Sequence, residues 1–164
     1  MSSKKKNHKV AIIMGSESDA EEMKPASDIL NELGIKNESR VISAHRTPDR
    51  LREYILDSEK NGVKVFIGGA GMAAALPGVI AAHTHLPVLG VPIESKSLKG
   101  MDSLLSIVQM PPGIPVGTVA IGKPGSKNAG LLAASILALE DKNIESKLKE
   151  FRKKQSDKVR KEPL

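Results

Sequence analysis

A histidine and an arginine stand side by side in the stretch Ser43-Ala44-His45-Arg46-Thr47-Pro48. An imidazole titrates near neutrality and can take or give a proton. A guanidinium can hold a phosphate or a carboxylate through two parallel hydrogen bonds. The residues before the pair predict a strand, while Thr47 as N-cap and Pro48 at N1 predict a helix start. An isolated pair of this kind is more often ordinary surface, but a strand-to-helix turn is where open α/β sheets bind ligands.

Three further loops carry groups that suit a nucleotide. They are residues 15–19, residues 69–73 and residues 94–97, and each follows an apolar run. Serine hydroxyls such as Ser16 and Ser43, together with helix-start amides and an arginine, make a phosphate site. The Asp19 carboxylate can accept hydrogen bonds from two ribose hydroxyls. Each serine alone is more often a helix cap, so it is their joint presence that points to a ligand.

Apolar runs and helical spacing alternate along the chain. The runs predict five strands, at residues 9–14, 38–42, 63–67, 87–92 and 116–121. The helical patterns lie at residues 18–33, 48–61, 73–84, 101–108 and 128–139. Ser18 and Glu21 fit a capping box for the first helix, in which Pro25 predicts a kink or a late helix start.

This alternation predicts an α/β fold, a three-layer αβα sandwich with a parallel sheet. The element lengths match a flavodoxin-like five-stranded sheet of order 2-1-3-4-5 with an extra C-terminal helix. We expect a disordered basic tail at residues 1–8, a single domain at 9–140 and a C-terminal helix and tail at 141–164. The last helix has only a thin apolar stripe of Ile144, Leu148 and Phe151. Packing on a neighbouring subunit is the preferred reading, with packing on its own domain as the alternative.

Composition excludes several classes of protein. The net charge of +6 comes from the two ends, since residues 9–139 carry 13 basic and 13 acidic side chains. Two Phe, one Tyr and no Trp leave few aromatics for stacking on bases, so a nucleic-acid partner is not expected. There is no Cys for a disulfide or a thiolate site, and no apolar run reaches the ~20 residues of a membrane span. A cytoplasmic protein without a membrane partner is the expectation.

The glycine loop supports one rival interpretation. Gly69, Gly71 and Ala74 match a dinucleotide fingerprint, and Glu94 follows about 20 residues later. The match falls on the third strand, and the remaining chain is too short for a separate substrate domain, so nicotinamide binding stays a minor alternative. His83 and His85 are interpreted as packing or capping residues and His8 as part of the tail. No group of His, Asp and Glu has the spacing of a metal site.

At these motifs the chain resembles class I N5-carboxyaminoimidazole ribonucleotide mutase, the catalytic subunit family of phosphoribosylaminoimidazole carboxylase. The likeness spans roughly residues 9–139. The matching motifs are residues 14–19, 43–48, 69–71, 76–78, 86–92, 102–111, 113–116 and 128–133.

The resemblance implies an isomerase of purine biosynthesis that moves a carboxylate from an exocyclic nitrogen to ring carbon C4. It implies a cytoplasmic homo-octamer with active sites at subunit junctions, and no metal, ATP or biotin. His45 would exchange the proton, and Ser16, Ser43 and Arg46 would bind the 5′-phosphate. Asp19 would bind the ribose, and the amides of Ala70, Gly71 and Met72 would face the migrating carboxylate.

The chain departs from the family pattern at three positions. Ala20 replaces a usual aromatic residue, Met72 a usual glycine and Ala75 a usual histidine. Two rival functions remain open. One is the class II enzyme of the same fold, which fixes free CO₂, and the other is a non-catalytic nucleotide-binding module. Arg46 followed by Thr47 and Pro48 favours class I.

Overall fold

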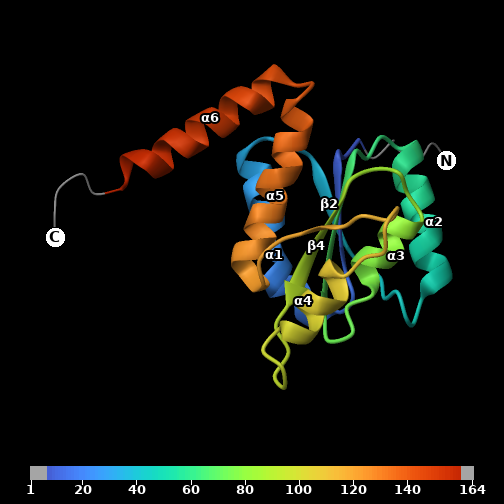
Figure 1. Cartoon of the computed structure of the whole chain (residues 1–164). Helices are drawn as coiled ribbons and strands as arrows, with labels where there is room; N and C mark the ends of the chain where they lie inside the picture. Colours follow the sequence, from blue (N-terminus) through green and yellow to red (C-terminus); the bar gives the residue numbers. More distant parts are fainter. Residues whose placement is uncertain (1–6, 160–164) are drawn as a thin grey trace.

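Five parallel strands form one sheet in the order β2-β1-β3-β4-β5 in the computed structural model, which describes residues 7–159 (Figure 1). The strands are β1 (Val10–Met14), β2 (Asn37–Val41), β3 (Val65–Gly71), β4 (Val88–Ile93) and β5 (Gly117–Thr118). The helices are α1 (Ala20–Glu32), α2 (Pro48–Lys60), α3 (Leu76–Ala82), α4 (Met101–Val108), α5 (Gly122–Ala138) and α6 (Lys142–Asp157), with a short 3₁₀ turn at Glu17–Asp19. The predicted fold class and strand order are confirmed.

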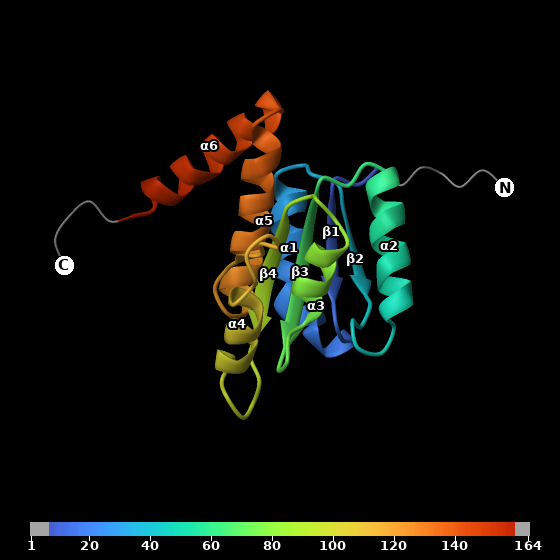
Figure 2. The same cartoon turned by 45° about the vertical axis from the view of Figure 1, so that its right-hand side comes forward.

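The sheet is covered on both faces, as the predicted sandwich requires (Figure 2). Side chains of a strand alternate between faces, so Val10, Ile12 and Met14 of β1 pack in a core with α1 and α5. Ala11 and Ile13 point the other way, into a core with α2 and α3. Burial of both faces explains why β1, β3 and β4 read as continuous apolar runs.

Helix α1 begins at Ala20 and runs through Pro25, so it does not start late, and the alternative expectation of a kink stays a prediction. A proline inside a helix removes one backbone donor and crowds the carbonyl four residues earlier. Fully buried Ser126 of α5 lies against this turn. Its Oγ accepts a hydrogen bond from the Ala26 amide at 3.1 Å and donates to the Met23 carbonyl at 3.0 Å. Ser126, which lies 100 residues after Ala26 in the sequence, thus supplies hydrogen-bond partners to two backbone groups of α1 beside Pro25.

The edge strand β2 is tied to its neighbours by Glu38. Its carboxylate accepts hydrogen bonds from the Tyr54 hydroxyl at 3.0 Å and from the Arg40 guanidinium at 2.9 Å. Burial, and the negative charge of Glu38, raise the pKa of the Tyr54 hydroxyl. His8 is buried, with Nε2 3.9 Å from the same carboxylate. The interpretation of His8 as part of a loose tail is therefore wrong, and the rest of that predicted tail, residues 1–6, lies outside the described residues.

Several element boundaries differ from expectation. Helix α3 begins at Leu76 instead of residue 73, and β5 has only two residues. Helix α5 begins at Gly122, six residues before the predicted start, with Pro124 in its first turn. The early start depends on Gly125, because a Cβ there would lie 1.5 Å from the Ala120 carbonyl oxygen.

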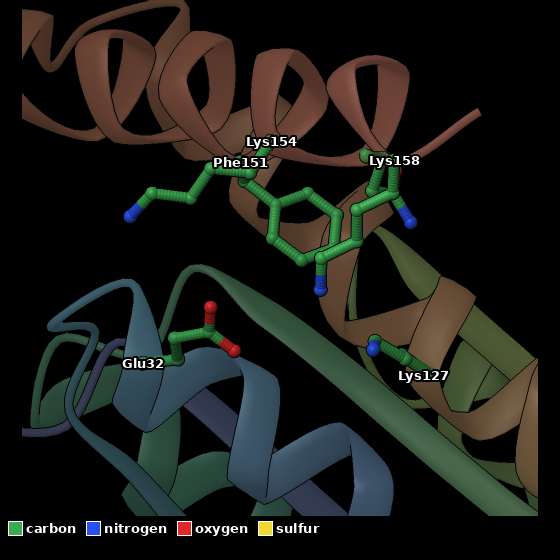
Figure 3. Close-up of a pocket in the computed structure, with 6 residues that line it drawn as sticks. Glu32, Lys127, Phe151, Lys154 and Lys158 are labelled. Atoms are coloured by element: carbon green, nitrogen blue, oxygen red, sulfur yellow. The ribbon is translucent and has the colours of Figure 1, made fainter. Parts of the chain in front are cut away.

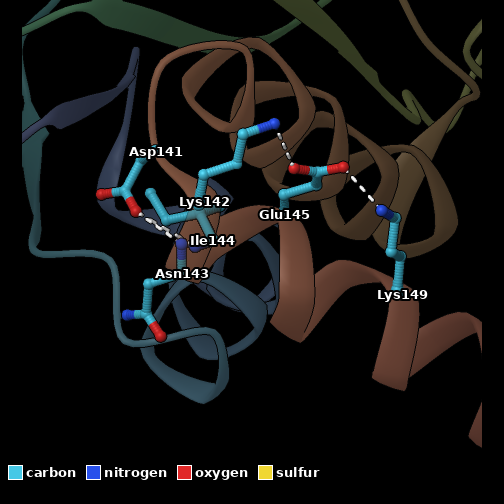
Figure 4. A network of polar contacts seen from close by, with 6 residues as sticks. All are labelled: Asp141, Lys142, Asn143, Ile144, Glu145 and Lys149. Atoms are coloured by element: carbon cyan, nitrogen blue, oxygen red, sulfur yellow. Dashed lines mark hydrogen bonds and ion pairs between the residues drawn. The ribbon is translucent and has the colours of Figure 1, made fainter.

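The C-terminal helix α6 starts at the end of α5 and extends away from the rest of the domain (Figure 1). Asp141 caps it, accepting from the amides of Asn143 and Ile144 at 2.9 and 3.2 Å. Glu145 accepts from Lys149 at 2.6 Å and from Lys142 at 2.9 Å, and these lysines lower the pKa of its carboxyl to about 2 (Figure 4).

The apolar stripe of α6 packs in part on its own domain. Its three apolar residues lie half-buried against the core between α1 and α5. Lys147 donates to the Leu33 carbonyl at 3.2 Å, at the C-terminal end of α1. The expected contact with a neighbouring subunit stays a prediction, and residues 160–164 of the tail lie outside the described part. Within residues 7–159, no helix is both long and apolar enough to cross a membrane.

Candidate active site

Four loops leave the carboxyl ends of adjacent strands and meet at one edge of the sheet. Met14 at the end of β1 pairs with Val41 of β2 on one side and with Gly69 of β3 on the other. Gly69 in turn pairs with Val91 of β4. The loops after β1, β2, β3 and β4 are therefore neighbours, and the reversal of strand order between β1 and β3 is where such folds bind ligands.

The loop after β1 is held by Ser16 and Asp19. Ser16 is the N-cap of the short 3₁₀ turn, and its Oγ accepts from the Ser18 amide at 3.3 Å and from the Ser18 hydroxyl at 3.0 Å. Asp19 closes the capping box by accepting from the Ser16 amide at 3.1 Å. The predicted box of Ser18 and Glu21 is therefore wrong. Because Ser16 Oγ is an acceptor in both contacts, its own O–H remains able to donate to a ligand.

Burial raises the pKa of the Asp19 carboxyl, while hydrogen bonds from Ser16, Ser18 and Gly15 oppose this rise. The side chain is only partly buried, so solvent or a ligand can still reach it. A carboxylate has about four lone-pair sites on its two oxygens, so these contacts do not use up its capacity to accept. This suits it to accept hydrogen bonds from hydroxyl groups.

The loop after β2 folds back on Ser43. Its Oγ accepts from the Arg46 amide at 3.1 Å, and its carbonyl accepts from the Thr47 amide at 3.0 Å. The Thr47 hydroxyl donates to the same carbonyl at 2.9 Å, so the predicted capping role, in which this hydroxyl accepts, is wrong. Pro48 does stand in the first turn of α2, as expected. The tight turn leaves the His45 and Arg46 side chains exposed.

The loop after β3 contains a backbone strain. Met72 has a φ of 57°, in the left-handed region that costs an L-residue about 1–2 kcal/mol. Its side chain is 69% exposed. Gly71 beside it packs tightly, because a Cβ there would lie 3.3 Å from the Ile93 carbonyl oxygen. Successive short turns over residues 72–75 take the place of the predicted first turn of helix, since a left-handed residue cannot continue one.

The loop after β4 is closed by a side-chain hydrogen bond that the sequence did not predict. Ser95 donates to both carboxylate oxygens of Asp102, at 3.0 and 2.9 Å. The Ser95 hydroxyl is therefore committed to closing the loop onto α4. Ser95 and Asp102 are seven positions apart in the sequence, and no helix-capping pattern has this spacing.

The structure thus places most of the predicted site residues in neighbouring loops of one sheet edge. Ser16, Asp19, Ser43, His45, Arg46 and Met72 are partly or fully exposed there, whereas Ala70 is buried. His83 and His85 lie in the turn before β4, at the opposite edge. Within residues 7–159, no three side chains of His, Asp and Glu are grouped to hold a metal ion.

Fold and loops together define a doubly wound α/β protein with a candidate ligand site at the carboxyl edge of the sheet. The family model described as "AIR carboxylase" matches residues 9–158. The chain therefore belongs to the AIR carboxylase family of enzymes, and the resemblance seen in the sequence is confirmed.

Curated relatives and solved structures agree with this assignment. Proteins named N5-carboxyaminoimidazole ribonucleotide mutase are similar over most of the chain. The one from Bacillus subtilis (strain 168) is 60% identical, covering 87% of this chain and 88% of its own. The one from Escherichia coli (strain K12) is 54% identical, covering 99% and 96%. A crystal structure of Treponema denticola PurE has a TM-score of 0.83 at 31% identity, covering 91% of this chain and 92% of its own.

Proposed function

We propose that this chain is a mutase of purine biosynthesis that converts N5-carboxyaminoimidazole ribonucleotide into 4-carboxy-5-aminoimidazole ribonucleotide. Relatives of 54 to 60% identity over at least 87% of the chain carry this name. The observation that carries the proposal is the turn centred on Ser43, which exposes His45 and Arg46 beside the Ser16 and Asp19 loop.

The phosphate end of the substrate fits the loops after β1 and β2. The Arg46 guanidinium offers paired N–H donors that match two phosphate oxygens. Ser43 Oγ accepts from the Arg46 amide, so its own proton can also be donated. Ser16 offers a third donor in the same way. Asp19, next along the loop, is the acceptor for the ribose hydroxyls.

The carboxylate end is assigned to the loop after β3. The backbone amides of Ala70, Gly71 and Met72 are the donors that would face the migrating group. Gly71 adds no side chain to this segment, and Met72 after it has a left-handed φ of 57°. Amides fixed in a concave turn are favourable for an anion because they need no reorganisation when it binds.

The reaction needs one group that gives and takes a proton. The bond from the exocyclic nitrogen to the carboxylate carbon breaks, its electron pair stays on nitrogen, and CO₂ is released. His45 as imidazolium donates a proton to that nitrogen. Carbon C4 of the ring then attacks CO₂, and neutral His45 removes the C4 proton, which restores the imidazolium. Holding CO₂ beside C4 supplies a high effective concentration.

Retaining CO₂ requires an enclosed pocket, so we propose that the active sites lie at subunit junctions. In line with the family resemblance, we propose a cytoplasmic homo-octamer. His45 and Arg46 are exposed on the single chain. Helix α4 and the turn before it also expose an apolar stripe. It comprises Leu98 at 58%, Met101 at 53%, Leu105 at 51% and Val108 at 47%. Apolar patches of this kind are usual at subunit contacts.

The test is to incubate the purified protein with the N5-carboxylated nucleotide and follow the ultraviolet absorbance of the C4 acid. Formation of the C4 acid without added bicarbonate or ATP is the expected result. Carboxylation of aminoimidazole ribonucleotide with bicarbonate, and no reaction of the carbamate, would instead assign the class II activity. Tight nucleotide binding without either reaction would assign a non-catalytic role.

A further inference from the structure

A groove of about 460 Å³ lies between α6 and the α1–α5 pair, away from the proposed active site (Figure 3). It is lined by Glu32 of α1, Lys127 of α5, Phe151, Lys154 and Gln155 of α6, and Lys158, the C-cap residue of α6. Its volume is within the range of small-ligand sites. Nothing in the proposed mutase reaction uses these residues.

Positive charge gathers in this groove from two helices. Lys127 comes from α5, while Lys154 and Lys158 follow one another by one turn of α6. Lys154 pairs with Glu150 at 2.7 Å, but the Lys158 ammonium makes no hydrogen bond or ion pair with any other described residue. The Lys154 ammonium is thus paired on its own helix, whereas the Lys158 ammonium is available to an anion in the groove.

The groove also has an aromatic face and an acceptor. Phe151 points from α6 towards α1, which carries Glu32 on the opposite wall (Figure 3). The Lys127 ammonium lies 5.5 Å from the centre of the Phe151 ring, within cation–π distance. An aromatic ring beside ammonium groups suits a ligand with a flat base and phosphates. The Glu32 carboxylate suits the hydroxyl or amino donors of such a ligand.

We propose that this groove binds a nucleoside polyphosphate. Lys154 and Lys158 lie at i and i+4, so their Cβ atoms are about 5–6 Å apart and their ammonium groups can reach different phosphates. The base packs against Phe151, and Lys127 bridges the ring and the phosphate chain. This site is separate from the phosphate site of the proposed reaction, and it does not depend on that reaction.

The experiment is calorimetric titration of the full chain with ATP at low salt, with tripolyphosphate and adenosine as further probes. Lys158→Ala should weaken ATP binding about tenfold, the scale of a lost hydrogen bond to a charged group. Lys153→Ala is the matched control, since Lys153 is exposed on the same helix and does not line the groove. ATP should bind more tightly than either tripolyphosphate or adenosine.

A second variant separates this groove from the active site. Arg46→Ala removes the principal phosphate ligand of the proposed active site and should leave ATP binding unchanged. Loss of ATP binding in Arg46→Ala would overturn the inference, as would equal affinity in Lys158→Ala and Lys153→Ala. A change of oligomeric mass in Lys158→Ala, measured by light scattering, would assign the groove to a subunit contact and equally overturn it.

Discussion

Replacing Ser126 with alanine removes the hydroxyl that serves α1 beside Pro25. That hydroxyl makes two hydrogen bonds in a fully buried position, accepting from Ala26 and donating to Met23. Each bond contributes about 0.5–1.5 kcal/mol, and unpaired buried partners cost more, so the variant should lose about 2–3 kcal/mol. For a chain of 164 residues this lowers Tm by roughly 4–12 °C. Scanning calorimetry at one fixed protein concentration measures it, because the proposed assembly would also stabilise the fold.

The same reasoning predicts a coupling between Ser126 and Pro25. Pro25→Ala removes the ring that crowds the Glu21 carbonyl, so the turn can close and the Ala26 amide and Met23 carbonyl can pair within α1. In that background Ser126→Ala should cost at least about 1 kcal/mol less than in the wild type. Ser135→Ala is the matched control on α5, because its hydroxyl bonds only the Leu131 carbonyl of its own helix. Equal costs of Ser126→Ala in both backgrounds would refute the account.

Four further predictions concern the site and the assembly. His45→Asn should lower kcat by about 10²–10⁴ while nucleotide affinity stays within a few-fold, whereas His85→Asn at the opposite edge should leave both unchanged. Met72→Gly should leave the free energy of unfolding unchanged or raise it by up to about 1 kcal/mol, because left-handed strain is removed and little burial is lost. Its Tm should therefore be equal to or above that of the wild type. Burial raises the pKa of Asp19, so its contribution to stability is lost as pH rises through that pKa. Urea midpoints from pH 3 to 7 should therefore fall more in the wild type than in Asp19→Asn, and the reverse order would contradict this. Leu105→Glu should reduce the mass seen by light scattering while the circular dichroism spectrum stays native, and an unchanged mass would count against the α4 contact.

The sequence predicted the architecture well because the core leaves a strong pattern. Strands buried on both faces are continuous apolar runs, and helices repeat apolar residues at their own spacing. Boundaries were harder where glycine and proline decide them. Residues 122–125 look like a loop, yet Gly125 is needed for a helix that passes against Ala120. β5 is also shorter than the apolar run of residues 116–121, since only Gly117 and Thr118 pair with β4.

The loops of the candidate site were predicted, but their internal bonds were not. Both Ser16 and Ser18 fit a cap by type, and only the backbone geometry selects Ser16 with Asp19. Thr47 occupies the N-cap position, but its hydroxyl is turned back to Ser43. Side-chain type predicts which groups can bond, whereas the choice of partner depends on torsions that local sequence does not determine.

The exposure of His45 and Arg46 has a physical consequence for the proposed chemistry. A CO₂ molecule released on an open surface diffuses away faster than a ring carbon can capture it, so proximity is useful only inside a closed space. On the single chain, the proposed proton carrier His45 and the proposed phosphate ligand Arg46 are both exposed. The chain also has an exposed apolar stripe on α4, which follows the loop that Ser95 and Asp102 fix beside this edge. Burying that stripe against another subunit would lower the free energy of assembly and bring a neighbouring surface towards the site. Assembly and retention of CO₂ are therefore expected to depend on each other.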